Sequence, residues 1–389
     1  MTSISRLFRP TGQGLKSGIV AVLALCFFSL QANAATPPPP QIAAKGYVLM
    51  DFNSGQIIAN KNADERLEPA SLTKMMTAYI VLDELARGKI NLTDDVLISE
   101  KAWRMPGSRT FVEVDTKVSV ETLLKGMIIQ SGNDASVALA EYIGGGEDVF
   151  ATMMNQIADK LGMKSSHFQN ATGLPHPEHY TTATDMAILA RALIHDFPEH
   201  YSWYSIKQYS YNGITQYNRN KLLWRDDSVD GLKTGHTEAA GYCLVASAKR
   251  DDMRLVSVVL GTKSEDARAV ESQKLLSYGF RFFESHQLYG LAESLAEVKV
   301  WKGETDALSL GIARTINIVI PRGEYDNLKA EMNIEPTITA PVNKGDTLGN
   351  VVVRLGDETV AQAPLVALKD IPEAGIVQSL MDEIMLMFE

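Results

Sequence analysis

The sequence predicts an α+β domain, then a small all-β domain, then an amphipathic helix at the C-terminus. Three observations predict this order. Helical patterns are interspersed with strands over residues 42–290, short alternating strands separated by turn residues fill 291–370, and 371–389 is helical again with one apolar face. With 389 residues, of which 45% are apolar and 22% charged, the chain has the size and composition of a two-domain globular protein.

The N-terminus has the pattern of a secretory signal peptide. Basic residues precede an apolar run at 18–30, and residues 32–34 read Ala-Asn-Ala, which is typical of a cleavage site. We therefore expect export from the cytoplasm, removal of residues 1–34, and Ala35 as the first mature residue. The alternative is an uncleaved membrane anchor, for which the apolar run is short.

Charge and cysteine content narrow the class of protein. Removal of the signal peptide takes away three basic residues and no acids, so the net charge falls from −10 to −13. An acidic exported chain is a poor candidate for binding nucleic acid. Only Cys243 stays in the mature chain, so no internal disulfide can form, and its apolar neighbours predict a buried, inert thiol.

The α+β domain is expected to begin with a hairpin and a buried helix. Residues 47–51 and 56–59 flank the turn residues at 53–55, which predicts a β-hairpin. A mostly apolar run that starts near Ser71 and closes near Gly88 predicts the helix.

Further helices and a second hairpin complete this domain. A polar segment, 131–134, separates the first two of these helices, and a loop at 170–175 precedes a later one. Residues 229–236 lead into an antiparallel hairpin formed by 241–248 and 253–261. Helices are expected at 118–129, 135–142, 147–161, 185–195 and 264–289.

The second domain shows almost no helical periodicity. It contains no cluster of chemically active side chains, so its expected role is support or spacing. Its strands are predicted at 297–301, 316–320, 337–340, 350–355 and 365–368.

The C-terminal helix is predicted to associate with a membrane surface. Its polar residues lie opposite the apolar ones, as in helices that rest in the membrane interface. The alternative is a helix packed on the protein itself or on a second chain, since no Lys or Arg follows Lys369 and anionic lipid repels acids. The apolar face comprises Ile376, Val377, Leu380, Met381, Ile384, Met385, Met387 and Phe388.

A serine and a lysine stand one helical turn apart at the start of the first helix. Residues three apart share a helix face, so the Lys74 amine can reach the Ser71 hydroxyl. Apolar neighbours disfavour the charge of Lys74, and a neutral amine can accept the proton of a serine. The pair is therefore a candidate nucleophile with its own base.

Two further short motifs follow in the chain. Ser131-x-Asn133 lies in the polar break between two helices, and Lys233-Thr234-Gly235 lies beside the second hairpin. Each motif alone is weak. The three together, in this order, are the signature set of penicillin-binding proteins and class A β-lactamases.

The surrounding sequence extends this resemblance over nearly the whole chain. The segments EPASLTKMMT at 68–77, QSGNDA at 130–135 and VDGLKTGHT at 229–237 resemble the low-molecular-mass D-alanyl-D-alanine carboxypeptidases of bacteria, the penicillin-binding protein 5 and 6 type. The resemblance implies a catalytic domain with a β-lactamase/transpeptidase-like fold. It also implies a periplasmic enzyme on the outer face of the cytoplasmic membrane that needs no metal or cofactor and binds no nucleic acid.

The resemblance assigns the chemistry to named residues. Ser71 attacks the penultimate D-alanine carbonyl of a peptidoglycan stem peptide and keeps the acyl group, with Lys74 as general base. Ser131 relays a proton to the leaving amine, helped by Lys233, which keeps the pocket positive. Asn133 holds a backbone amide of the substrate. Penicillins and other β-lactams are implied to acylate the same serine.

The remaining residues are implied to bind the substrate. Thr234 and Arg268 hold the terminal carboxylate, and Gly235 leaves room for the peptide along the strand. The backbone N–H groups of Ser71 and His236 form the oxyanion hole.

Three alternatives stay open at the sequence level. A β-lactamase shares the motifs, but class A enzymes use a loop glutamate and residues 160–177 contain no acid. A transpeptidase or endopeptidase differs only in the acceptor of the acyl group, and a non-catalytic peptidoglycan sensor could keep the fold. The residue that assists deacylation is not identifiable: the loop 170–180 offers Thr172 but no obvious base, and His176 and His179 are expected at the surface.

Overall fold

The computed structural model describes residues 36–387. The predicted signal peptide and cleavage site therefore lie outside the described residues, as does Phe388 of the C-terminal apolar face.

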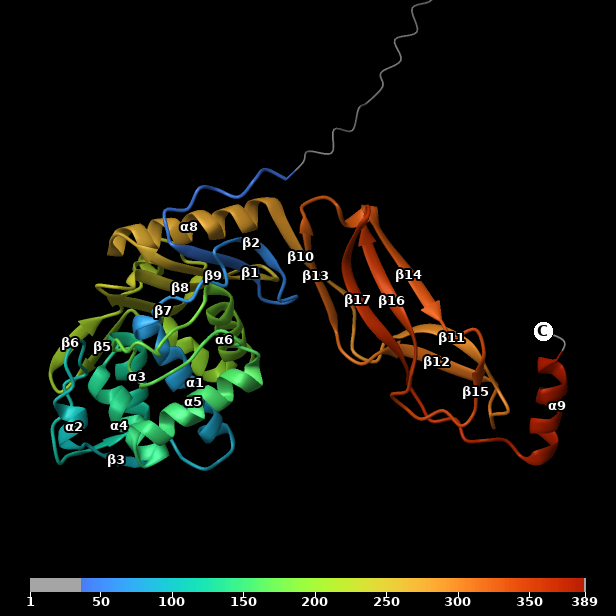
Figure 1. Ribbon diagram of the computed structural model, residues 1–389, viewed down its shortest axis with the longest axis horizontal. Helices are drawn as coiled ribbons and strands as arrows, with labels where there is room; N and C mark the ends of the chain where they lie inside the picture. The colour runs from blue at the N-terminus through green and yellow to red at the C-terminus, as the bar shows by residue number, and fades with distance from the viewer. Residues whose placement is uncertain (1–35, 388–389) are drawn as a thin grey trace, which may run out of the picture. The chain divides into compact units, whose positions relative to one another are not determined.

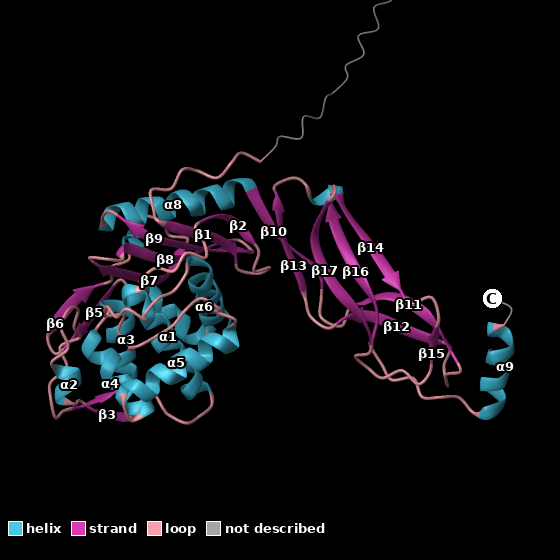
Figure 2. Cartoon of the chain, in the orientation of Figure 1, coloured by secondary structure: helices cyan, strands magenta, loops and turns pink. Residues whose placement is uncertain are grey.

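The α+β domain is built on a five-stranded antiparallel sheet with the order β2-β1-β9-β8-β7 (Figures 1 and 2). β1 (Gly46–Asp51) and β2 (Ile57–Lys61) confirm the first hairpin, and β8 (Gly241–Arg250) and β9 (Met253–Thr262) confirm the second. The segment expected to lead into the second hairpin is itself a strand, β7 (Val229–Thr237). Because β7 ends the sheet, one row of its backbone groups has no partner strand.

Helices cover both faces of this sheet (Figure 1). α8 (Glu265–Phe282) packs on one face, and α1 (Lys74–Ala86) and α6 (Ala183–Asp196) lie on the other. The strands serve both layers because successive side chains point to opposite faces. Val48 joins the core around α1, whereas its neighbour Leu49 joins the core under α8.

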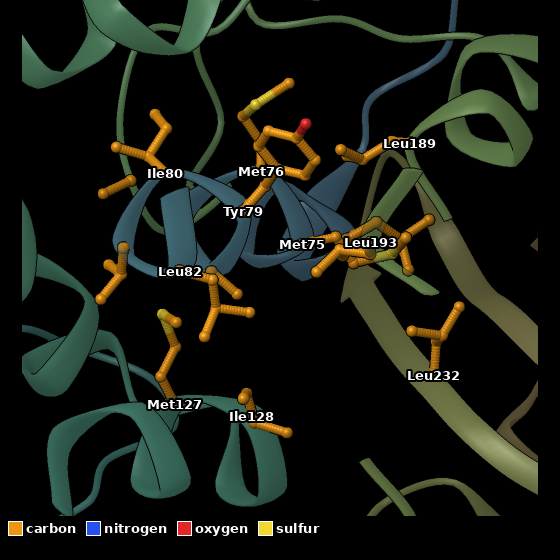
Figure 3. Close-up of a cluster of buried hydrophobic side chains, with 14 of the residues drawn as sticks. Met75, Met76, Tyr79, Ile80, Leu82, Met127, Ile128, Leu189, Leu193 and Leu232 are labelled. Atoms are coloured by element: carbon orange, nitrogen blue, oxygen red, sulfur yellow. The ribbon is translucent and has the colours of Figure 1, made fainter. Parts of the chain in front are cut away.

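The core around α1 explains why this helix has almost no polar surface. Met75, Met76, Ile80 and Leu82 are buried on all sides of it, against Met127 and neighbours from other helices (Figure 3). Full burial of such a side chain contributes about 1.5–3 kcal/mol to folding. The nucleophile predicted at the start of α1 thus sits on a rigid element.

The predicted helices of the rest of this domain occur in the predicted order, and short helices and strands that were not predicted lie among them. α5 has the predicted bounds, whereas α3 begins later than expected because 117–119 form a short strand and the Ser119 hydroxyl caps the helix by accepting from Thr122 N. The elements are β3 (Asp95–Leu97), α2 (Glu100–Trp103), β4 (Lys117–Ser119), α3 (Val120–Gln130), α4 (Asn133–Gly144), α5 (Glu147–Leu161), α7 (Pro198–Tyr201), β5 (Gln208–Tyr211) and β6 (Ile214–Tyr217).

The C-terminal region is all-β as predicted, although three of its strands, β10, β12 and β14, were not expected. Six strands form one sheet with the order β14-β16-β17-β12-β11-β15, and β10 pairs with β13. The strands are β10 (Phe283–Tyr289), β11 (Ser294–Trp301), β12 (Ala307–Ile312), β13 (Ile316–Pro321), β14 (Leu328–Ile334), β15 (Ile338–Thr339), β16 (Thr347–Leu355) and β17 (Glu358–Ala367).

Two helix predictions need correction. The helix expected at 264–289 ends at Phe282, because the next seven residues pair with β13 as β10, so strand pairing begins before the expected boundary at residue 291. The helix expected at 371–389 is shorter: Ile371 is buried and forms a bridge with Val342, and α9 runs from Ile376 to Leu386. Among residues 36–387, no helix is both long and apolar enough to cross a membrane.

Candidate active site

The predicted nucleophile lies in a tight turn that leads into α1. Residues Ala70–Thr73 form a 3₁₀ turn, and Ala70 has a φ of 47°, in the left-handed region that L residues rarely adopt. Such strained backbone clusters at functional sites. Ser71 is partly exposed in this turn, and Lys74 is the first residue of the α-helix that follows.

Lys74 is 1% exposed and lies within hydrogen-bond distance of three oxygen atoms. Its Nζ lies 3.1 Å from Ser71 Oγ, 2.7 Å from Asn133 Oδ1 and 2.6 Å from the Thr172 carbonyl oxygen. Burial, and after it the charge of Arg219, lowers the pKa of Lys74 to about 7. A substantial fraction of the amine is therefore neutral near neutral pH.

The three contacts orient the lone pair of a neutral Lys74. The Thr172 carbonyl can only accept, and Asn133 presents its oxygen because its Nδ2 donates to the Pro106 carbonyl at 2.6 Å. A neutral amine gives its two hydrogens to these two acceptors. Its lone pair is then left for the hydroxyl of Ser71, which is the geometry that a general base needs.

Ser131 and Asn133 lie on either side of the break between α3 and α4, as predicted. Ser131 ends α3 in the left-handed conformation, with a φ of 65°, and α4 begins at Asn133. The buried carboxylate of Asp134 holds the break in place by accepting from the backbone N–H groups of Thr110 and Phe111. Asn133 was expected to hold the substrate, but in this structure its amide contacts Lys74 and Pro106.

The third motif lies on the edge strand β7 and reaches the second motif. Lys233 Nζ donates to Ser131 Oγ at 2.9 Å and to the Thr234 carbonyl at 3.0 Å. Burial, followed by the charge of Lys74, lowers the pKa of Lys233 well below its ordinary value, which works against a permanent positive charge on this side chain. A Cβ at Gly235 would lie 3.0 Å from the Pro69 carbonyl, so the glycine lets β7 approach the Ser71 turn.

Arg268 projects from the first turns of α8 into the same region. It is 3% exposed, and its Nη1 donates to the Gly235 carbonyl at 3.2 Å. Its Nη2 is buried without a hydrogen-bond partner, 3.6 Å from Glu265 Oε1. Burial lowers the pKa of Arg268, so a bound anion would stabilise this side chain.

These residues line one cleft of about 420 Å³. Lys74 and Lys233 lie beneath it, bonded to the two serines that reach its surface. The structure thus brings together every residue predicted for the site. The predicted residues that line the cleft are Ser71, Ser131, Asn133, Thr234, Gly235, His236 and Arg268.

Two contributions to the site were missed by the sequence analysis. Arg219 lines the cleft and adds a cation to that of Arg268, but no motif marks it. The second contribution is the backbone carbonyl of Thr172, which no side-chain pattern can reveal.

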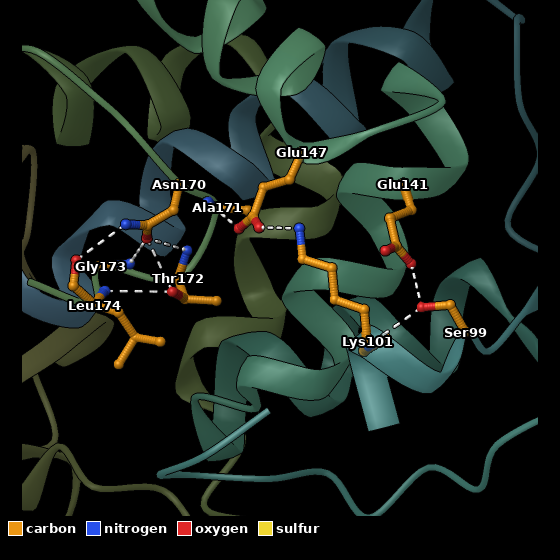
Figure 4. Close-up of polar contacts among 10 residues, drawn as sticks. Ser99, Lys101, Glu141, Glu147, Asn170, Ala171, Thr172, Gly173 and Leu174 are labelled. Carbon is orange, nitrogen blue, oxygen red and sulfur yellow. Dashed lines mark hydrogen bonds and ion pairs between the residues drawn. The ribbon is translucent and has the colours of Figure 1, made fainter. Parts of the chain in front are cut away.

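The loop 168–179 delivers this carbonyl. Antiparallel hydrogen bonds between His167 and Tyr180 close the loop, and within it Asn170 Oδ1 accepts from three groups of Thr172 and Gly173 (Figure 4). Residues 160–177 contain no acid of their own, but the side chain of Glu147 from α5 contacts this loop. Its carboxylate accepts from Ala171 N at 3.2 Å and pairs with Lys101 at 2.7 Å (Figure 4).

Two further predictions concern a cysteine and two histidines outside the three motifs. Cys243 is buried, and burial raises the pKa of its thiol to about 11, as expected for an inert cysteine. The expectation for the histidines is half wrong: His176 is exposed, but His179 is buried against Thr73 because the loop folds back onto the Ser71 turn.

A serine with an adjacent buried amine, at the edge of an antiparallel sheet and beside the cations Arg219 and Arg268, can support acyl transfer from an anionic substrate. Known proteins share this architecture. Residues 31–264 match the model of peptidase family S11, the D-alanyl-D-alanine carboxypeptidases, and residues 283–373 match the C-terminal domain of penicillin-binding protein 5.

Individual relatives agree with the family models. The D-alanyl-D-alanine carboxypeptidase DacC of Escherichia coli is 43% identical over an alignment of 398 residues, gaps included. The alignment covers 100% of this chain and 98% of the relative. The crystal structure of penicillin-binding protein 5 from Haemophilus influenzae superposes with a TM-score of 0.85 at 44% identity, over 87% of this chain and 100% of that one. Penicillin-binding protein D2 of Listeria monocytogenes, in its ampicillin-bound form, has a TM-score of 0.58 at 29% identity and covers 63% of this chain.

The chain belongs to the D-alanyl-D-alanine carboxypeptidase family. It is a carboxypeptidase of the penicillin-binding protein 5 and 6 type, with a function in the cell wall. The predicted fold, an α+β catalytic domain with an all-β domain and a terminal helix, is confirmed. A peptidoglycan substrate and the binding of β-lactams fit this family.

Proposed function

We propose that Ser71 is the nucleophile of the carboxypeptidase and that Lys74 is its general base. The arrangement around Lys74 Nζ carries this proposal, because two fixed acceptors direct the lone pair of the neutral amine toward Ser71 Oγ. Ser71 Oγ attacks the penultimate D-alanine carbonyl of a peptidoglycan stem peptide. The bond to the terminal D-alanine breaks, and water later releases the shortened peptide from the serine.

The second motif is proposed to serve the leaving group. Ser131 passes a proton to the amine of the departing D-alanine, and Lys233 supports it through the 2.9 Å contact between Nζ and Ser131 Oγ. Asn133 orients the amine of Lys74, in addition to its expected contact with a backbone amide of the substrate. The backbone N–H groups of Ser71 and His236 stabilise the oxyanion, where a single donor is worth about 2.7–4 kcal/mol.

The cations of the cleft are proposed to bind the terminal carboxylate of the substrate. Arg268 has an unpartnered buried Nη2, and Thr234 and Arg219 line the cleft with it. Bidentate binding by a guanidinium suits a carboxylate. A peptide with a blocked C-terminus lacks this contact, so the site favours a free terminal D-alanine.

The location of the enzyme is also a proposal. We infer that residues 1–34 direct export to the periplasm and are then removed, that the β-rich region acts as a spacer, and that α9 rests on the outer face of the cytoplasmic membrane. The apolar face of α9 supports the last point: Ile376 is 89% exposed, and its neighbours on that face are exposed as well. The polar side of α9 contacts the β-rich region of the same chain, where Lys302 N donates to Asp382 Oδ2 at 2.6 Å.

The test uses residues 35–389 and a peptide that ends in D-Ala-D-Ala. Release of free D-alanine by the native enzyme, and its loss in Ser71→Ala, is expected if Ser71 is the nucleophile. Intact-mass analysis after exposure to benzylpenicillin is expected to show an adduct on the native chain and none on Ser71→Ala. An active Ser71→Ala enzyme would contradict the assignment. Rapid loss of the adduct with destruction of the penicillin would favour a β-lactamase instead.

A further inference from the structure

His179 is a buried side chain to which neither the motifs nor the proposed mechanism assigns a role. It is 2% exposed, and its ring packs edge-on against Phe168 with the ring centroids 5.7 Å apart. Its Nε2 lies 2.9 Å from Thr73 Oγ1. Thr73 stands between Ser71 and Lys74 in the sequence, so this contact reaches the backbone that carries both groups.

The hydrogen-bond partners of His179 fix its tautomer. The backbone N–H of Gln169 donates to Nδ1 at 3.4 Å, so Nδ1 is an acceptor. In a neutral ring the hydrogen then resides on Nε2, which donates it to Thr73 Oγ1. Burial, followed by the charges of His167, His176 and Lys74, lowers the pKa of His179 to about 4, so the ring is neutral at the pH of the reaction.

The contact ties the loop 168–179 to the start of α1 at a third point. Thr77 Oγ1 donates to the Ala171 carbonyl at 2.8 Å, and Lys74 Nζ contacts the Thr172 carbonyl. His179 adds the anchor at the other end of the loop, opposite these two. A Cβ at Gly173 would lie 1.7 Å from the Ala70 carbonyl, so the loop packs directly on the Ser71 turn.

We propose that His179 is a positioning residue: it clasps the loop 168–179 onto the Ser71 turn and so keeps the Thr172 carbonyl within hydrogen-bond distance of Lys74 Nζ. This inference rests on the proposed role of Lys74 as general base. If the carbonyl moves away, one hydrogen of the neutral amine loses its acceptor, and the lone pair is no longer directed at Ser71. His179 then acts on the chemical step through Lys74, without touching the substrate.

The test compares His179→Leu, His179→Gln and His176→Ala in the mature enzyme. His179→Leu keeps the volume but removes the donor, so kcat and the rate of Ser71 acylation by benzylpenicillin are expected to fall by about 10- to 100-fold, with KM changed by less than about threefold. His179→Gln places an N–H near the former Nε2 and is expected to restore most of the rate. His176→Ala changes an exposed side chain of the same loop and is expected to react like the native enzyme.

The outcomes separate this inference from the proposed function. If the native enzyme forms no adduct on Ser71, the proposed function fails and the inference with it. If the native enzyme reacts and the Leu and Gln variants behave alike, His179 acts only by filling space and the inference is overturned. Should His179→Leu not fold, Thr73→Val removes the same contact from the other side; a native acylation rate in that variant also overturns the inference, and a loss of similar size supports it.

Discussion

α1 and α9 are both rich in methionine, leucine and isoleucine, yet these side chains are mostly buried in α1 and mostly exposed in α9. In α1 the apolar side chains from Met75 to Leu82 are buried (Figure 3). The one lysine of this helix has all of its hydrogen-bonding positions occupied. In α9 the apolar face is exposed, and the buried group is the acid Asp382. Similar compositions therefore give a buried support beneath the cleft in one helix and an exposed apolar face in the other.

The difference lies in which groups are removed from water. Burial of a charged group is costly unless it is paired, so burial lowers the pKa values of the two amines beneath the cleft and favours their neutral forms. Exposure of apolar groups is costly too, and a face that stays exposed in the isolated chain gains free energy by entering an apolar phase. Predictions that disturb each environment separately test this contrast.

The largest expected effect in this comparison comes from Arg268, a buried cation with an unpartnered Nη2. Arg268→Gln removes the charge that we propose binds the substrate carboxylate. A hydrogen bond to a charged group is worth about 1.5–3 kcal/mol, so kcat/KM for a D-Ala-D-Ala peptide should fall by about 10- to 100-fold. Steady-state release of D-alanine measures this change.

Arg281→Gln provides the matched control for Arg268. Arg281 lies near the other end of α8, is exposed, and is not among the residues that line the cleft. It should keep the native kcat/KM. An equal loss in both variants would mean that α8 itself is disturbed, and an unchanged Arg268→Gln would remove this side chain from the carboxylate site.

The pH dependence of acylation should show the effect of burial on Lys74. Its pKa of about 7 means that the fraction of neutral amine falls about tenfold for each pH unit below that value. We expect the rate of Ser71 acylation by benzylpenicillin to rise by roughly tenfold from pH 6 to pH 8 and then to level off. Stopped-flow acylation across this range gives the inflection, and a flat profile would argue against Lys74 as the base.

Stability should change with pH in the same direction as activity. The pKa of Lys74 is lower in the folded chain than in the unfolded chain, where it is 10.5, so the unfolded chain binds more protons between pH 7 and 10.5. The contribution of Lys74 to the free energy of unfolding therefore increases with pH across this window and is smallest below pH 7.

The sequence could predict the parts of the site that depend on local spacing. Ser71 and Lys74 are one helical turn apart. Ser131 and Asn133 flank a break between two helices, and polar residues in the sequence indicate that break. Arg219, His179 and the Thr172 carbonyl could not be found in this way. The contacts of His179 and of the Thr172 carbonyl depend on how a loop closes over a helix about a hundred residues away in sequence. Arg219 lines the cleft from a segment in which no motif marks it.

Much of the fold could also be predicted from local sequence pattern. The errors lie where pairing between distant strands overrides that pattern. The hairpins and α5 follow from periodicity and turn residues alone. β14 was missed although its polar residues Lys329, Glu331 and Asn333 alternate with apolar ones; most of its side chains are exposed, and its pairing with β16 places it in the sheet. Residues 283–289 were assigned to a helix because the pattern of α8 continues into them, and pairing with β13 decides otherwise.

The smallest effect on catalysis should come from deletion of α9, which tests the other side of the comparison. The deletion should begin at Ile376, because Ile371 is buried and pairs with Val342, so a cut at 371 would damage the β-rich region itself. In a chain that ends at Gly375, the rate of D-alanine release in solution should match the native rate within about twofold, since no residue of α9 lines the cleft.

The same chain should fail to sediment with lipid vesicles that retain the native protein. A double substitution, Leu380→Ser with Ile384→Ser, changes two exposed residues of the apolar face and should weaken sedimentation in the same way. If both variants still sediment, α9 is not the anchor; if the native protein forms a dimer that both variants lose while vesicle binding is absent throughout, the apolar face joins two copies of the chain.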